Sequence, residues 1–96
     1  MSIKVVLNLE VTQTNLSEYL EFLKENLPNV RVFQGCKSVK IYFNNQTNEM
    51  AINEIWESKE SHDNYIKFIS QNGIMAKLIS FLSTEPNIKY YDILDL

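Results

Sequence analysis

The sequence predicts a single α+β domain with the element order β-α-β-β-α-β. Three patterns support this order: alternating apolar residues at the start, two β-rich segments around a polar turn, and helical apolar spacing on both sides of that pair. With 96 residues, 45% of them hydrophobic, the chain has enough apolar material for one core. We therefore expect residues 1–96 to form one domain.

The first strand and the first helix follow from two different periodicities. Over residues 3–11 apolar side chains occupy every second position, which predicts a strand with one firmly apolar face. Over about residues 15–27 leucines recur at helical spacing, and Asn15 followed by Glu18 resembles a helix-opening pair. The chain therefore begins with a strand followed by a helix.

The middle of the chain predicts a β-hairpin. Pro28 is expected to stop or kink the first helix, and residues 29–34 to form a short second helical piece. Residues 36–44 and 49–57 are both β-rich and are separated by a run of polar turn formers. This arrangement favours two antiparallel neighbouring strands.

The last third predicts two helices and a closing strand. Ser58 is expected to cap a helix over residues 59–71, and an Asn-Gly pair ends that helix. A short helix follows over residues 74–82, and the closing strand covers residues 87–94. Four strands in this order form one antiparallel sheet with its helices on one face, the ferredoxin-like arrangement.

The second face of such a sheet has no cover from its own chain. It is expected to carry a mixture of polar, aromatic and aliphatic side chains: Val6, Asn8, Lys40, Tyr42, Tyr90 and Asp92. Two such sheets packed face to face would form a dimeric α+β barrel, so we expect a homodimer, with a solvated face in a monomer as the alternative. These side chains would either line a ligand cavity or form a wet interface.

Composition excludes several classes of partner. Nine basic residues against 12 acidic ones give a net charge of -3, and the basic residues are scattered, which disfavours nucleic acid. No apolar run resembles a signal peptide or reaches the length needed to cross a bilayer, so no membrane partner and a cytoplasmic location are expected. Cys36 and His62 are each unique, which leaves no cluster for zinc or a transition metal.

Two segments resemble a known family. The run Gln34-Gly35-Cys36 before the hairpin, and Asn53-Glu54-Ile55-Trp56-Glu57-Ser58-Lys59-Glu60 after it, are similar to the antibiotic biosynthesis monooxygenase (ABM) family of dimeric α+β barrel proteins. The resemblance implies a homodimer that oxidises quinols, anthrones or similar reduced aromatics with O2, without flavin, haem or metal. The resemblance also implies that the substrate carries the chemistry, so the protein need supply only a base or hydrogen-bonding groups, aromatic walls and exclusion of water.

Three residues are candidates for catalysis. Glu54 would act as a base if burial raised its pKa, and the alternative is an ion-paired or solvated carboxylate. His62 exchanges protons near neutrality when unperturbed, and the alternative is an inert histidine on a helix surface. Tyr65 stands nine residues after Trp56, where many family members carry a histidine. His62, one helical turn earlier, would partly substitute for that histidine on nearly the same face.

Three further residues are candidates for substrate binding: Asn8, Tyr42 and Trp56. Trp56 would either stack on an aromatic substrate or lock the strand end against the next helix. Cys36 is expected to be a small packing residue. Arg31, the sole arginine, would either clamp an anion or remain solvated.

The leading functional hypothesis is therefore a cofactor-independent monooxygenase. The rival hypothesis is a non-catalytic dimeric module of the same fold that binds a small ligand. A weaker alternative is haem degradation: Asn8 fits that pattern, but Tyr65 and Met75 stand where haem-degrading relatives carry a tryptophan and the histidine that binds iron.

Overall fold

Four strands and three α-helices follow one another in the order β-α-β-β-α-α-β in the computed structural model, which describes residues 2–96. Their bounds are β1 (Ile3–Glu10), α1 (Leu16–Arg31), β2 (Cys36–Asn44), β3 (Glu49–Trp56), α2 (Lys59–Gln71), α3 (Ile74–Ser80) and β4 (Asn87–Asp92). A short 3-10 turn, Gln13–Asn15, precedes α1. The predicted hairpin and the predicted helix over residues 59–71 are confirmed.

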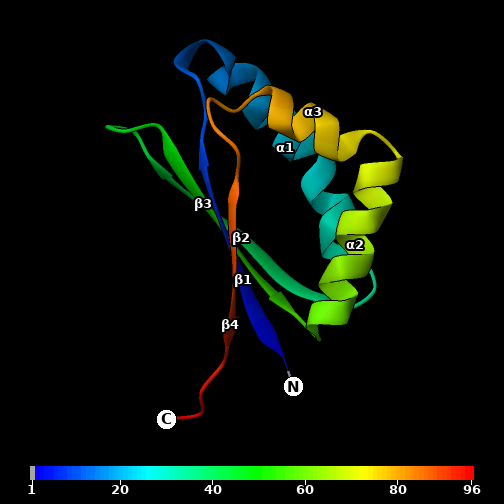
Figure 1. The fold of residues 1–96 in the computed structure, drawn as a ribbon. Coiled ribbons are helices and arrows are strands. Elements are labelled where there is room, and N and C mark those ends of the chain that lie inside the picture. The colour runs from blue at the N-terminus through cyan, green and yellow to red at the C-terminus, as the bar shows by residue number, and fades with distance from the viewer. Residues whose placement is uncertain (1) are drawn as a thin grey trace.

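The strands form one antiparallel sheet in the order β2-β3-β1-β4. All three helices lie on the same side of this sheet, and the other side has no covering element among the described residues (Figure 1). This confirms the predicted ferredoxin-like α+β fold. No helix among residues 2–96 is both long and apolar enough to span a bilayer.

The core lies between the sheet and the helix layer. On β1 the residues at alternate positions, Val5, Leu7 and Leu9, are buried against the helices. On β3 the buried positions also alternate, so a polar residue in this register is carried into the core with its apolar neighbours. The strand periodicity therefore determines which side chains reach the helix layer.

The first helix is longer than expected. Pro28 lies inside α1 rather than at its end, and residues 29–31 continue the helix, so the predicted separate helical piece over 29–34 is wrong. Pro28 removes one backbone hydrogen bond, but Val30 beyond it is buried in the core and Arg31 Nη2 donates a hydrogen bond to Val39 O at 3.0 Å. These tertiary contacts hold the last turn in place.

Four further local expectations need correction. Asn15 is the residue before α1, but its side chain makes no capping hydrogen bond, whereas the side chain of Ser58 does cap α2 as predicted. The first strand ends at Glu10, and Val11 forms only an isolated bridge with Leu82. The last helix and the closing strand each end two residues earlier than expected, at positions 80 and 92.

The face assignment of β4 is also corrected. Tyr90 pairs with Val5 and Asp92 pairs with Ile3, both on the helix-covered side of β1. Tyr90 and Asp92 therefore lie on the covered side and not on the open face where the sequence placed them. A shift of one residue in register moves every side chain of a strand to the opposite face, and β4 has too little apolar content to fix that register by pattern alone.

Gly35 explains why the turn before β2 can lie against α2. Its φ is 93°, and a Cβ at this position would lie 2.5 Å from both Cβ and Oγ of Ser61. Its carbonyl oxygen accepts a hydrogen bond from Glu57 N at 2.7 Å. Only glycine fits this close contact, which positions the first turn of α2 beside the ends of β2 and β3.

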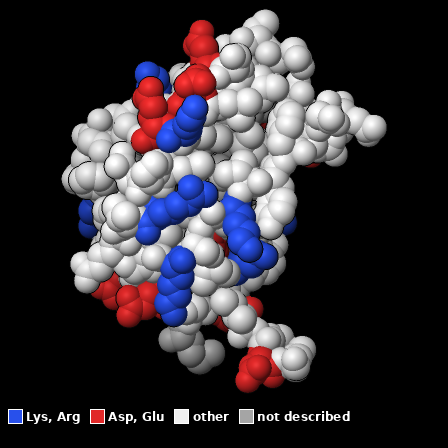
Figure 2. Space-filling view, turned by 180° about the vertical axis from the view of Figure 1, so that it is seen from behind, with Lys and Arg blue, Asp and Glu red and all other residues white. Residues whose placement is uncertain are grey.

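Charge is distributed unevenly over the surface. In the view from behind, Lys and Arg side chains gather in the middle of the molecule, while Asp and Glu side chains lie toward its upper and lower ends (Figure 2). The register places three lysines, Lys4, Lys40 and Lys89, on the open face of the sheet. The two glutamates at the end of that face, Glu10 and Glu49, are paired across β1 and β3.

Candidate functional site

An apolar cavity of about 50 Å³ lies between the sheet and the helices. Its walls come from β1, β3 and β4 on one side and from α1, α2 and α3 on the other. Most of the lining side chains are aliphatic. The polar side chains that reach it are Asn26, Glu54, His62 and Tyr65. The cavity therefore combines a dry environment with a few convergent polar groups, which is the usual composition of a small-molecule site.

Glu54 is a carboxylate inside the core. It shares the inward face of β3 with Met50, Ile52 and Trp56, and its residue is only 6% exposed. Its Oε1 accepts a hydrogen bond from Trp56 Nε1 at 2.7 Å. Burial raises the pKa of the Glu54 carboxyl, and the hydrogen bond from Trp56 opposes this rise in part. A carboxylate with a raised pKa in an apolar setting is a stronger base than one in water.

His62 lies directly opposite Glu54, on the inward face of α2. It is 1% exposed, and its Nε2 lies 3.6 Å from Glu54 Oε1. Burial lowers the pKa of His62 to about 4. Two smaller effects oppose each other: Asp63 raises this pKa and Lys59 lowers it. The imidazole is therefore neutral at pH 7 and retains one N–H.

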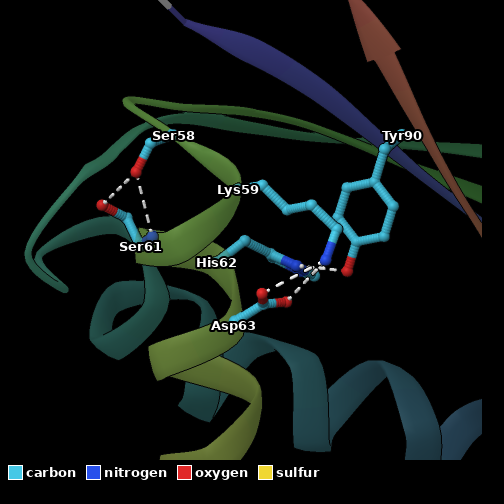
Figure 3. A network of polar contacts seen from close by, with 6 residues as sticks. All are labelled: Ser58, Lys59, Ser61, His62, Asp63 and Tyr90. Atoms are coloured by element: carbon cyan, nitrogen blue, oxygen red, sulfur yellow. Dashed lines mark hydrogen bonds and ion pairs between the residues drawn. The ribbon is translucent and has the colours of Figure 1, made fainter.

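The second ring nitrogen of His62 contacts Tyr90 from β4. His62 Nδ1 and the Tyr90 hydroxyl lie 3.0 Å apart, and Figure 3 shows the imidazole directed at that hydroxyl. Burial raises the pKa of Tyr90, so its hydroxyl keeps its proton and can either donate to Nδ1 or accept from it. The Glu54 carboxylate near Nε2 can only accept, so it favours the tautomer whose single N–H is on Nε2, in which the Tyr90 hydroxyl donates to Nδ1. A chain of contacts thus runs from Trp56 through Glu54 and His62 to Tyr90.

The first turn of α2 sets the position of His62. The Ser58 hydroxyl accepts a hydrogen bond from Ser61 N at 3.1 Å, which caps the helix at its start (Figure 3). Lys59 Nζ lies 4.9 Å from the centre of the Tyr90 ring and pairs with Asp63 at 3.2 Å. These exposed charges surround the outer end of the His62–Tyr90 contact.

Aromatic rings surround the inner end of the site. Tyr65 lines the cavity, and its ring centre is 5.5 Å from that of Trp56 and 5.1 Å from that of Phe33. Burial raises the pKa of Tyr65, and the nearby Glu54 carboxylate adds to this rise. Trp56 is fully buried and does not line the cavity. Its role in this structure is therefore to pack in the core and to donate a hydrogen bond to Glu54.

The predicted site residues divide into two groups. Glu54, His62 and Tyr65 line the cavity, and Trp56 packs against Tyr65 and hydrogen-bonds to Glu54. Asn8 and Tyr42 lie on the opposite face of the sheet, where each pairs with Ala51 of β3, and both are exposed. The structure does not bring these two into the cavity.

Sequence reasoning did not place two further residues in this group: Asn26, which lines the cavity, and Tyr90, which contacts His62. Asn26 occurs in α1 among residues at helical spacing, and its Nδ2 donates to Phe22 O at 2.8 Å within the helix. Tyr90 was expected on the other face. The alternation of Ile88 and Tyr90 along β4 is the one signal that could have placed them on the same side.

Other reactive groups are accounted for by packing. Cys36 is half-buried, and burial together with Glu54 raises the pKa of its thiol, which keeps it protonated. Arg31 hydrogen-bonds to the β2 backbone. Within residues 2–96 no three His, Cys, Asp or Glu side chains are grouped closely enough to hold a metal ion.

No protein-family model matches the chain, and no curated protein matches it in sequence. Solved structures do match it over nearly its whole length. A conserved protein from Methanosarcina mazei is 22% identical with a TM-score of 0.85, covering 95% of this chain and 91% of that chain. A protein named antibiotic biosynthesis monooxygenase is 11% identical with a TM-score of 0.85, covering 97% of this chain and 99% of that chain.

A third match is named as an oxidoreductase candidate. This protein from Bacteroides thetaiotaomicron is 16% identical with a TM-score of 0.80, covering 96% of this chain and 97% of that chain. At such identities the likeness shows a common fold. The chain therefore has the ABM-like fold that its sequence resemblance predicts.

Proposed function

We propose that this protein is a cofactor-independent monooxygenase that oxidises a small reduced aromatic compound, of quinol or anthrone type, with O2. The observation that carries this proposal is the buried pair of Glu54 and His62 at the wall of an apolar cavity. The name of one structural neighbour and the description of another as an oxidoreductase candidate agree with it.

Glu54 is the base in this proposal. It removes the proton of a phenol or enol, and the resulting electron-rich anion passes electrons to O2 and forms a carbon–oxygen bond. Glu54 then returns its proton to the peroxide. Loss of the remaining hydrogen on the oxygenated carbon, together with the outer OH group, breaks the O–O bond, forms the carbonyl and releases water. For an anthrone the methylene group and O2 become a carbonyl group and water, so atoms and electrons balance without a further reductant.

His62 and Tyr65 support this chemistry. The neutral imidazole directs its Nε2–H toward Glu54 and holds the carboxylate in one orientation without neutralising it. The Tyr65 ring forms an aromatic wall beside the carboxylate. The aliphatic lining excludes water, which strengthens the electrostatic interaction between the substrate anion and the groups around it.

The decisive experiment is O2 uptake with a panel of quinols and anthrones, measured in the presence of a metal chelator and corrected for autoxidation. We expect Glu54→Gln to lower protein-dependent uptake by about 10²–10⁴-fold, the usual contribution of a general base. Glu57→Gln is the matched control, because Glu57 is an exposed glutamate just after β3. Equal uptake by both variants would remove Glu54 from the mechanism.

The rival function is a non-catalytic module that binds a small ligand in the same cavity. The observation in its favour is Tyr65, which stands where many members of the resembling family carry a histidine. Binding of the panel compounds without any protein-dependent O2 uptake would establish this second function.

The open face of the sheet supports a homodimer. It carries half-buried Val6 and Ile55 beside exposed Tyr42 and Tyr91, and no element of the described chain covers it. Packing this face against the same face of a second copy would form a closed twofold dimer, the commonest oligomer. Light scattering at micromolar concentration is expected to give twice the monomer mass, and a monomer mass would contradict the dimer.

A further inference from the structure

A second hollow lies immediately outside the cavity, between the end of α1 and the outer side of α2. This outer groove has a volume of about 460 Å³. Five of its lining residues are apolar: Val32, Phe33, Phe68, Ile69 and Ile74. Two of them face water, since Val32 is 83% exposed and Phe68 is 52% exposed. Apolar side chains grouped in an exposed hollow are typical of a surface that a ligand covers.

The outer groove and the cavity share one wall. Asn26, Tyr65, Ile69 and Ile74 line both spaces, so these four residues form the partition between them. The Tyr65 ring packs edge-on against Phe33, whose ring is 5.6 Å from that of Phe68. A rotation of the Tyr65 side chain would therefore connect the groove with the space in front of Glu54.

The two volumes require such a connection. An apolar cavity of about 150 Å³ is large enough to bind a single benzene ring, and the inner cavity is about a third of that size. The outer groove alone lies within the roughly 300–1,000 Å³ range of small-molecule sites. An aromatic ring can approach Glu54 only if the partition opens, and the remainder of a larger molecule then stays in the groove.

The rim of the outer groove has a distinctive chemistry. Four primary amides lie on it, Asn26, Asn29, Gln34 and Asn72, and none of its described lining residues is charged. Asn72 Oδ1 accepts from Ile74 N, which leaves its NH₂ group as a donor. Asn29 and Gln34 make no side-chain hydrogen bond with the described residues. Such a rim can donate to and accept from a neutral polar group but offers no cation to a carboxylate.

We propose that the outer groove is the distal half of the substrate site, and that it takes an uncharged aromatic molecule of two or more rings with a hydrogen-bonding group at its far end. Tyr65 is the gate between the two halves. This inference rests on the proposed function, because it assumes that the reacting ring approaches Glu54. It adds the size, the charge and the entry path of the substrate.

The test uses three redox-stable probes: naphthol, and the same naphthol with either a carboxamide or a carboxylate on the ring remote from the hydroxyl. Isothermal titration calorimetry on the wild-type protein is expected to show the carboxamide binding about tenfold more tightly than the carboxylate. Phe68→Ala removes the apolar floor and is expected to weaken carboxamide binding by about five- to tenfold. Phe43→Ala is the matched control, because Phe43 is a partly exposed phenylalanine on β2 outside both hollows.

Three results would overturn the inference: equal affinity for carboxamide and carboxylate, no effect of Phe68→Ala, or no binding of any probe. Its failure is separable from failure of the proposed function. O2 uptake that depends on Glu54 but is unaffected by Phe68→Ala would refute the groove and leave the monooxygenase in place. Selective carboxamide binding that Phe68→Ala weakens, without O2 uptake on any compound, would support the groove and refute the monooxygenase.

Discussion

On β3, Glu54 and Trp56 face the helices, while Asn53 and Ile55 between and beside them face the open side of the sheet. The two faces are built from alternate residues of the same strands, but their surroundings differ. Under the helices a carboxylate, an imidazole and an indole contact one another in a dry space. On the open side lysines and tyrosines lie beside small and aliphatic side chains. The helices bury one face of the sheet and leave the other exposed. This burial, more than the residue types, is what shifts the pKa values of polar groups on the covered face.

Truncation of one large aromatic on each face gives the largest expected difference. Trp56→Ala removes a fully buried side chain and leaves Glu54 without its hydrogen-bond donor, so we expect a loss of about 3–5 kcal/mol in the free energy of unfolding. Tyr42→Ala, on the open face, is expected to cost less than about 1 kcal/mol within the subunit. Urea denaturation of both variants measures these losses.

Repeating the two denaturation series at several protein concentrations sharpens this comparison. The loss caused by Trp56→Ala is expected to stay the same at all concentrations, because that residue lies inside the subunit. The loss caused by Tyr42→Ala is expected to change with concentration if the open face pairs with a second copy. Equal losses for the two variants at every concentration would contradict the distinction between the faces.

The pH dependence of stability tests the covered face in a second way. The pKa of His62 is 6.5 when unperturbed and about 4 in the folded protein, so between these values the unfolded chain binds a proton that the folded protein does not. Stability therefore falls as pH falls through this window, by up to about 3 kcal/mol. Glu54 acts in the opposite sense, because its pKa is higher in the folded state.

A His62→Gln variant isolates the contribution of the histidine. Asp63 and Lys59 on α2, Glu54 on β3 and Tyr90 on β4 all face His62, and all four remain in the variant. We expect thermal or urea unfolding of His62→Gln to depend less steeply on pH between about 6.5 and 4 than unfolding of the wild type. Parallel pH profiles would show that His62 is not held neutral by burial.

The smallest expected effect comes from adjacent tyrosines on β4. Tyr90→Phe removes the hydroxyl that contacts His62 Nδ1 at 3.0 Å, which is expected to cost about 1 kcal/mol. Tyr91→Phe is the matched control, because Tyr91 pairs with Lys4 on the open face and is expected to stay within about 0.5 kcal/mol of the wild type. If both variants lose the same stability, the Tyr90 contact adds nothing to the folded state.

The element types and the fold class could be predicted from the sequence because they depend on local periodicity. Alternation identified the strands, helical spacing identified α1 and α2, and the Ser58 cap was placed correctly. The same alternation places Glu54 and Trp56 on one face of β3, since residues two apart on a strand share a face. These features need only a short stretch of chain.

What only the tertiary structure decided depends on contacts between distant segments. The register of β4 against β1 brings Tyr90 to His62, and no local pattern in β4 fixes that register. The burial of Val30 and the contact of Arg31 with β2 carry α1 past Pro28. The approach of Gly35 to Ser61 sets the start of α2, and the packing of Tyr65 separates the cavity from the outer groove. Local propensity selects the elements, but side-chain packing between them determines which polar groups are buried together.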